Sequence, residues 1–246
     1  MPGPLKSEAV VLRSLRYGEA DRILHLYTPH RGRASAIAKG VRRARSRFGG
    51  RLEPFFRLRL VLWEPRSGSE LLTVTSAETL SAHPRLREHA AALDCAARAC
   101  DAVARLFDTP EAQPGVYHLL CNELALLDAR ATEEQAFAGH ANQLAFRLKL
   151  LLAAGLAPQL AACAACGEAD HLVAFSGAAG GVVCASCEAS GFPLGPDAHE
   201  FMTAALGAPL AQAPTADERA LRQAERAIAE TVEHHAHVRL RAAKPG

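Results

Sequence analysis

Apolar and polar side chains alternate along the first eighty residues of the chain. In FRLRLVLW, residues 56–63, every second residue from Phe56 to Leu62 is apolar, and arginines stand between the first of them. A repeat of two is typical of a strand with one buried face. The same pattern, with Gly and Pro turns between the runs, predicts strands at 8–14, 22–28, 33–39, 57–63 and 71–78. Short strands at this density predict a small barrel, either an OB-fold or an SH3-like barrel.

Beyond Pro84 the apolar residues recur every three or four positions, which is the period of amphipathic helices. Three segments have the residues of a capped helix start. They are Thr109-Pro110, Thr132-x-x-Gln135 and Thr215-x-x-Glu218. The predicted fold class is therefore α+β and multidomain. A five-stranded OB-fold barrel at the N-terminus is followed by a central and C-terminal α-helical domain.

Four of the seven cysteines form two close pairs, Cys163-x-x-Cys166 and Cys184-x-x-Cys187. The 17 residues between the pairs are rich in glycine and indicate a short hairpin. Two such pairs supply four thiolates, which complete the tetrahedral coordination of zinc and leave no position for a reacting water. We therefore expect one structural Zn²⁺ in a module of this type. The alternatives are two redox-active pairs or a site that has lost its metal.

These patterns predict three parts of the chain. A nucleic-acid-binding barrel is expected at 1–80, an α-helical domain at 81–160 together with 195–246, and an inserted zinc-binding module at 161–194. No apolar run is long enough to span a membrane, and the first residues lack the plan of a signal peptide. Paired cysteines without a disulfide framework favour a reducing, cytoplasmic location.

The net charge of +2 conceals a strong asymmetry along the chain. Residues 1–80 contain 15 Lys and Arg against 7 Asp and Glu, a net charge of +8, whereas residues 81–246 have a net charge of −6. Such a split indicates an N-terminal part that faces a polyanion. The densest run of positive charge, AKGVRRARSRFGGR at 38–51, contains no acid.

We expect this run to be a mobile loop whose guanidinium groups bind successive phosphates of a nucleic acid. The competing interpretation is a solvated loop in an arginine-rich protein. The candidate DNA-binding residues are the cations of the loop and of the strand after it: Lys39, Arg42, Arg43, Arg45, Arg47, Arg51, Arg57 and Arg59. Aromatic side chains near the loop are candidates for stacking on bases, namely Tyr17, Phe48, Trp63 and Phe56, of which Phe56 is expected to be buried.

A metal-dependent hydrolase or a zinc deaminase is a different class of function. A zinc deaminase requires a His-x-Glu motif ahead of a Pro-Cys-x-x-Cys motif, and the chain contains neither. The predicted four-thiolate site also has no open position. No catalytic residue is therefore assigned.

The run from Tyr17 to Trp63 resembles the N-terminal domain of the RecO family of bacterial recombination mediators. The matching motifs include Tyr17-Gly18-Glu19, Ala38-Lys39-Gly40 and Leu52-Glu53-Pro54-Phe55, followed by the arginine strand. Further on, KLLLAAGLAPQLAACAAC, residues 149–166, is similar to the helix that leads into the zinc module of this family. The resemblance extends over essentially the whole chain.

This resemblance implies an OB-fold, a helical domain and a zinc-binding module in a protein that is not an enzyme. It also implies binding to single- and double-stranded DNA and annealing of complementary strands. The expected partners are RecR and the single-stranded-DNA-binding protein, with RecA loaded indirectly, in the cytoplasm at the nucleoid. An RNA-binding or ribosome-associated protein is the alternative, because phosphate contacts alone do not distinguish the two sugars.

Overall fold

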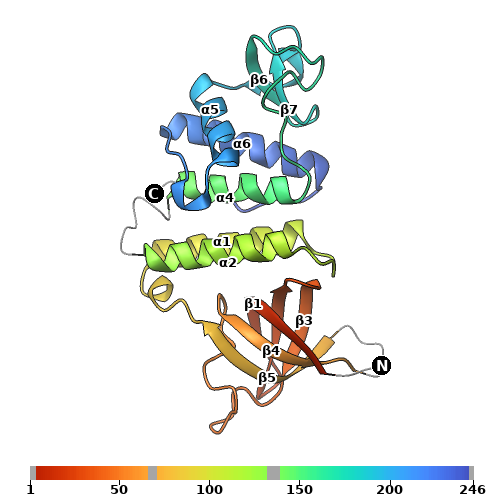
Figure 1. Ribbon diagram of the computed structural model, residues 1–246, viewed down its shortest axis with the longest axis vertical. Coiled ribbons are helices and arrows are strands. Elements are labelled where there is room, and N and C mark those ends of the chain that lie inside the picture. Colours follow the sequence, from red (N-terminus) through yellow and green to blue (C-terminus); the bar gives the residue numbers. More distant parts are fainter. Residues whose placement is uncertain (1–3, 66–70, 132–138, 244–246) are drawn as a thin grey trace. The chain divides into compact units, whose positions relative to one another are not determined.

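The computed structural model describes residues 4–65, 71–131 and 139–243, and the chain divides into two compact units, Met1–Ala129 and Arg130–Gly246 (Figure 1). The first unit contains the barrel and the helices α1 and α2. The second contains α4 to α6 and the paired cysteines. The three-part division into 1–80, 81–160 with 195–246, and 161–194 stays a prediction. In the described ranges, no helix is both long and apolar enough for a membrane span.

The N-terminal strands form a closed barrel, as the alternating pattern predicts. The strands are β1 Pro4–Tyr17, β2 Asp21–Thr28, β3 Gly32–Ala38, β4 Arg57–Trp63 and β5 Leu71–Ser81. Their order around the barrel is β1-β2-β3-β5-β4, with β3 and β5 parallel and all other neighbours antiparallel. The predicted OB-fold barrel is confirmed.

Strand β1 is longer than expected because it belongs to both sides of the barrel. Its first half, from Pro4 to Val10, pairs with β4, and the part from Val10 to Tyr17 pairs with β2. The register of β1 against β2 shifts between Val11 and Arg13, so that Val11 pairs with Leu26 and Arg13 with His25. Such a bulge bends a strand and increases its twist, which allows one strand to close the barrel.

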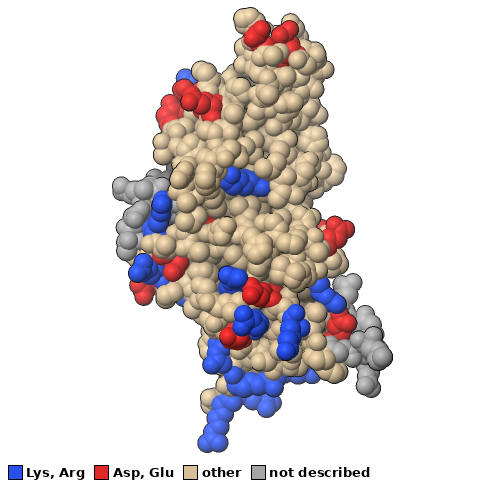
Figure 2. All heavy atoms as spheres, viewed as in Figure 1, with Lys and Arg blue, Asp and Glu red and all other residues tan. Residues whose placement is uncertain are grey.

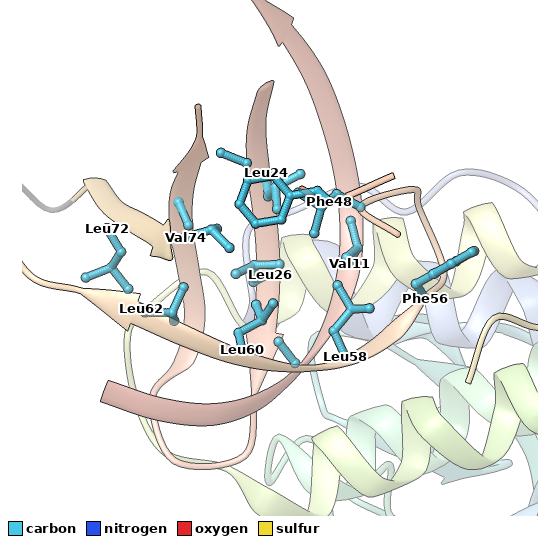
Figure 3. Packing of buried hydrophobic residues seen from close by; sticks show 14 residues of the cluster. Val11, Leu24, Leu26, Phe48, Phe56, Leu58, Leu60, Leu62, Leu72 and Val74 are labelled. Carbon is cyan, nitrogen blue, oxygen red and sulfur yellow. The ribbon is translucent and has the colours of Figure 1, made fainter. Parts of the chain in front are cut away.

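The barrel core consists of the inward-facing residues of every strand (Figure 3). Leu58, Leu60 and Leu62 of β4 are at most 1% exposed, which confirms the burial predicted for one face of this strand. Three further residues of the core come from the connection between β3 and β4. They are Phe48 and Leu52, each 1% exposed, and Phe56, which is 9% exposed and buried as predicted.

Helices α1 and α2 complete the first unit, after a short 3₁₀ turn at Arg85–Arg87. Helix α1 spans Ala90–Leu106 and α2 spans Pro114–Ala129. The helix start predicted at Thr109-Pro110 is therefore wrong by several residues. The Thr109 carbonyl instead accepts a hydrogen bond from the Arg33 N–H of β3 at 3.4 Å, which ties this segment to the barrel.

The second unit has three described helices, α4 His140–Ala153, α5 Pro196–Gly207 and α6 Glu218–His235. The capping pattern at 132–135 lies outside the described residues. The start predicted at Thr215 is wrong, because Asp217 is the N-cap of α6 and its Oδ1 accepts from the Ala220 N–H at 2.7 Å. Helix α5 was not predicted, although a first-turn proline and Asp197 mark its start.

Between α4 and α5 lies a small three-stranded sheet. Its strands are β6 Leu172–Ser176, β7 Gly181–Cys184 and β8 Phe192–Pro193, in the order β7-β6-β8. The hairpin of β6 and β7 is the one predicted between the cysteine pairs. Short 3₁₀ turns occur at Glu188–Ser190 and Leu210–Gln212.

Candidate nucleic-acid interface and metal site

The connection between β3 and β4, residues 39–56, is a series of hydrogen-bonded turns, and we call it the arginine loop. At its start the Gly40 N–H donates to Asp21 Oδ1 at 2.8 Å and the Arg42 N–H donates to the Ala20 carbonyl at 2.9 Å. At its end the Phe55 N–H donates to the Val11 carbonyl at 2.8 Å. Gly40 has a φ of +68°, a conformation that side-chain-bearing residues rarely adopt. The loop is thus held by hydrogen bonds at both ends, whereas the sequence predicted a mobile loop.

Phe48 anchors the middle of the arginine loop in the barrel. Its ring lies among Leu24, Leu26 and Val11, and the side chain is buried (Figure 3). Phe48 was a candidate for stacking on bases, and this interpretation is wrong because the ring is inside the core. The sequence could not reveal this, since the loop lacks the alternation that marks a buried strand residue.

The cations at the outer side of the arginine loop have no carboxylate partner in the described residues. Lys39, Arg42, Arg43 and Arg45 are exposed, and no ion pair of theirs occurs within the described parts of the chain. Figure 2 shows Lys and Arg side chains projecting at the end of the barrel where Figure 1 places this loop. An anion can therefore approach them without displacing a carboxylate of the protein.

Two other loop arginines are partly held by the protein. The guanidinium of Arg47 lies 4.8 Å from the centre of the Phe48 ring and donates to the Val74 carbonyl at 3.5 Å. Arg51 donates to the Arg47 carbonyl at 3.2 Å. Both side chains are exposed, and these contacts compensate neither charge, because they are made to carbonyl groups and an aromatic face.

The two candidate arginines of β4 are in ion pairs. Arg57 Nη2 lies 2.7 Å from Glu8 Oε2, and Arg59 Nη1 lies 2.8 Å from Glu78 Oε2. Glu8 Oε1 also lies 4.0 Å from Arg59 Nη2. Of the predicted DNA-binding residues, these two are therefore the ones whose charge is compensated within the protein.

A row of mostly apolar residues crosses the outer face of the barrel. Strand register places Leu15, Ile23, Ile37, Thr73 and Trp63 side by side, one from each strand. Leu15 is 42% exposed and Trp63 is 39% exposed. Exposed apolar and aromatic side chains on an OB-fold offer surfaces on which bases can stack.

Tyr17 extends this row toward the arginine loop. It is 53% exposed and lies opposite Asp21 at the end of the β1–β2 hairpin. Because Asp21 accepts the hydrogen bond of Gly40, Tyr17 and the start of the arginine loop lie at the same end of the barrel. An aromatic ring and unpaired cations are thus brought together from segments that are separate in the sequence.

The four paired cysteines meet at one point of the second unit. Each contributes one sulfur, and the four sulfurs lie within 4.8 Å of one another. The distance between Cys166 Sγ and Cys184 Sγ is 3.7 Å. Zinc bound by four thiolates at about 2.3 Å separates neighbouring sulfurs by about 3.8 Å. The predicted ligand set is therefore assembled with spacing that fits a tetrahedral metal ion.

The protonation chemistry of these sulfurs also fits a bound cation. Backbone hydrogen bonding, mainly at Cys184, lowers the pKa of the Cys163 thiol to about 6. The sulfur neighbours of Cys187, first Cys166 and then Cys184, raise its pKa to about 12. One thiolate is stabilised by the fold, but several adjacent thiolates require a positive ion to ionise together.

Backbone contacts shape the cysteine module and fix it to the helices. Gly181 lies so close to Gln159 that a Cβ would come within 2.2 Å of the Gln159 carbonyl oxygen, which only glycine avoids. His235 Nε2 of α6 lies 2.8 Å from the Gly177 carbonyl oxygen. Arg226 of α6 lies 4.0 Å from the centre of the Phe192 ring. The metal site is therefore part of the packed second unit.

Comparison with known proteins gives a consistent result over both units. Residues 1–83 match the family model described as Recombination protein O N terminal, and residues 87–244 match the one described as Recombination protein O C terminal. A DNA repair protein RecO of Anaeromyxobacter sp. (strain Fw109-5) is 36% identical over 246 residues, which cover 97% of this chain and 93% of that protein. The protein of the same name from Rubrobacter xylanophilus is 38% identical over 231 residues, covering 90% and 89%.

Proposed function

Because this chain belongs to the Recombination protein O family of DNA repair proteins, we propose that it is a DNA-binding recombination mediator without catalytic activity. In this proposal it binds single- and double-stranded DNA and anneals complementary strands. Together with RecR it helps to load RecA on DNA coated by the single-stranded-DNA-binding protein. It acts in the cytoplasm, at the nucleoid.

One observation carries the DNA-binding part of the proposal. Lys39, Arg42, Arg43 and Arg45 lie on a loop fixed at both ends, and no carboxylate of the described residues pairs with them. Cations that are already paired must exchange one anion for another, whereas unpaired cations gain the full effect of counterion release when they bind phosphates. Arg47, Arg51, Arg57 and Arg59 complete the proposed set, the last two with a smaller contribution because of their ion pairs.

The aromatic surface next to the loop supports single strands as the main ligand. Tyr17 and Trp63 are exposed on the outer face of the barrel, and both rings can receive an unstacked base. Stacking and phosphate contacts do not read the edges of bases, so the binding should tolerate different sequences. Neutralisation of the phosphates lowers the repulsion between two strands, which would promote annealing.

We assign the metal as a single structural Zn²⁺ held by Cys163, Cys166, Cys184 and Cys187. Four sulfurs within 4.8 Å suit zinc, which prefers tetrahedral thiolate coordination. Such a site contributes folding free energy and leaves no ligand position for a substrate. The ion would therefore stabilise the second unit and take no part in DNA chemistry.

The loop can be tested by removing three of its charges. In the variant Arg42→Gln/Arg43→Gln/Arg45→Gln, affinity for a labelled single-stranded oligonucleotide should fall at least about tenfold at low salt, because three phosphate contacts are lost. The rate of strand annealing should fall with it. Fluorescence anisotropy measures the first quantity and a quenching assay with complementary strands measures the second.

The matched control removes three exposed arginines from the second unit. Arg219→Gln/Arg222→Gln/Arg239→Gln has the same change in net charge and should bind DNA like the wild type. Equal loss of affinity in both variants would indicate an effect of net charge only and would contradict the assignment of the loop. Tighter binding of RNA than of DNA of equal length would support the RNA-binding alternative.

A further inference from the structure

The cysteines outside the metal site are protected from solvent. Cys95 and Cys100 of α1 are each 2% exposed, and Cys121 of α2 is 9% exposed. Burial raises the pKa of Cys100 and of Cys121, so these two thiols stay protonated at neutral pH. Because the thiolate is the form that reacts with oxidants, neither access nor ionisation favours oxidation of these side chains.

The four cysteines of the metal site differ from one another in exposure. Cys163 and Cys184 are 3% and 4% exposed, Cys187 is half-buried, and Cys166 is exposed. Cysteine binds zinc as a thiolate, so every sulfur of the occupied site is deprotonated. Cys166 is therefore a thiolate within reach of solvent, which is the combination that makes a cysteine susceptible to oxidation.

A second sulfur lies close enough to Cys166 to form a disulfide with it. Cys184 Sγ is 3.7 Å from Cys166 Sγ. A disulfide bond of about 2.0 Å requires the two sulfurs to approach by roughly 1.7 Å. A sulfenic acid formed at an exposed cysteine condenses with a neighbouring thiolate. Cys184 can thus convert oxidation of Cys166 into a covalent link between the two cysteine pairs.

The charges of this segment favour an uncharged oxidant. Residues 150–218 contain no Lys or Arg, and Glu168, Asp170 and Glu188 follow the cysteines closely in the sequence. Such an acidic segment repels anions, among them glutathione disulfide. A small neutral peroxide is not repelled and can reach the exposed sulfur of Cys166.

We propose that Cys166 and Cys184 form a peroxide-sensitive switch that releases the metal ion of the second unit. The inference rests on the zinc assignment made in the proposed function. The Cys166 thiolate attacks one oxygen of hydrogen peroxide, so that an S–O bond forms, the O–O bond breaks and the departing hydroxide takes up a proton. The Cys184 thiolate then attacks the oxidised sulfur, so that the S–S bond forms, the S–O bond breaks and a second hydroxide is protonated. Two electrons pass from the sulfurs to the peroxide, which becomes two molecules of water.

Oxidation removes half of the ligands and weakens the attachment of the module. The thiolates of Cys163 and Cys187 remain, which are too few for the four-coordinate site that zinc prefers. His199 Nε2 of α5 lies 2.7 Å from the carbonyl oxygen of Leu160, three residues before Cys163. The folding free energy supplied by the ion is lost with it, so the segment next to this contact loosens until a thiol reductant restores the site.

Release of zinc under peroxide tests this proposal. The zinc-loaded chain is treated with hydrogen peroxide while a chromogenic chelator records the released metal. One zinc ion per chain should be released, and peptide mass spectrometry should find a disulfide between Cys166 and Cys184. Dithiothreitol with added zinc should reverse both changes. Glutathione disulfide at the same concentration should act at least about tenfold more slowly, because it is an anion.

Two variants that keep four ligands separate the roles of the sulfurs. Three cysteines and one histidine also form a tetrahedral zinc site. Cys166→His removes the exposed thiolate and should slow the release of zinc at least about tenfold. The matched control Cys187→His retains both reacting sulfurs and should release zinc at the wild-type rate.

Three outcomes would overturn the switch. They are a wild type that keeps its zinc under peroxide, a disulfide that joins other cysteines, and equal release rates in the two histidine variants. Because the disulfide is mapped in the wild type, the test does not depend on the folding of either variant. A wild type that contains no zinc when purified would instead overturn the metal assignment of the proposed function.

Discussion

Phe48 and Tyr17 show how burial separates two aromatic residues that the sequence presents alike. Both lie next to basic residues and both are candidates for base stacking. Phe48 is 1% exposed within the barrel core, whereas Tyr17 is 53% exposed at the end of the β1–β2 hairpin. The first therefore stabilises the fold and holds the arginine loop, and the second is free to contact a ligand.

Substituting alanine at these two positions should produce opposite results. Phe48→Ala removes a buried ring and should reduce the free energy of unfolding by about 3–5 kcal/mol. Tyr17→Ala should leave stability nearly unchanged but weaken single-stranded DNA binding by about 1–3 kcal/mol, the usual effect of one lost stacking contact. Urea unfolding and anisotropy titration measure the two quantities. A stable Phe48→Ala variant, or unchanged affinity of Tyr17→Ala, would contradict this division of roles.

At the scale of elements, the strands were predictable and the beginnings of the helices were not. One buried face imposes a repeat of two on each barrel strand, and this signal is local. A helix start depends on which nearby polar residue actually caps the helix. Asp217, two residues after Thr215, caps α6. The Thr109 carbonyl accepts a hydrogen bond from Arg33 of β3.

Contacts between distant elements leave no local pattern in the sequence. The pair of Arg57 and Glu8 joins residues 49 positions apart, and Tyr117 is 109 positions from Glu8. Alternation predicts that Arg57 faces outward, but it cannot indicate the carboxylate that meets it. For this reason the sequence predicted the cysteine ligands, whose spacing is local, but did not predict which polar side chains on the surface form pairs.

Helices α4 and α6 are joined by a half-buried carboxylate, Glu225. Its Oε2 lies 3.2 Å from His140 Nε2, and its Oε1 lies 3.5 Å from Arg147 Nη1 and accepts from the Ala243 N–H. Burial raises the pKa of Glu225, but the hydrogen bonds of His140 and Ala243 and the charge of Arg147 outweigh it, so the pKa lies below its usual value.

A lowered pKa makes this contribution to stability dependent on pH. It should be fully present above the pKa of an unfolded glutamate, about 4.3, and should be lost as the pH falls through the lower pKa of the folded state. Glu225→Gln should therefore be less stable than the wild type by about 1–3 kcal/mol at pH 7. The difference should shrink in acid. Thermal unfolding from neutral to acidic pH measures it, and a difference independent of pH would contradict the assignment.

On the scale of the whole molecule, positive charge and metal ligands occupy different parts of the chain. Residues 150–218, which contain all four paired cysteines, have no Lys or Arg and seven Asp and Glu. Figure 2 shows acidic and no basic side chains over the β6–β7 module on the visible face. This segment is therefore unsuited to phosphates, and its metal should affect stability without affecting the electrostatics of DNA binding.

Removing one thiolate should separate these two effects. Cys184→Ser should lose bound zinc and unfold at a lower temperature, because zinc binding contributes to folding free energy. The salt dependence of DNA binding by the protein that stays folded should be unchanged. Cys121→Ala, which removes a cysteine from α2, should retain the metal. Elemental analysis and calorimetry provide the measurements, and a zinc-free wild type with full stability would contradict the structural role of the ion.

The central claim is that unpaired cations of the arginine loop bind DNA phosphates. The most direct test is the salt dependence of single-stranded DNA affinity, compared between the wild type and Arg42→Gln/Arg43→Gln/Arg45→Gln. Each lost contact should reduce the slope of log affinity against log salt by about 0.7, so the variant should be shallower by about 2. Equal slopes and equal affinities in the two proteins would show that these arginines do not contact the DNA backbone.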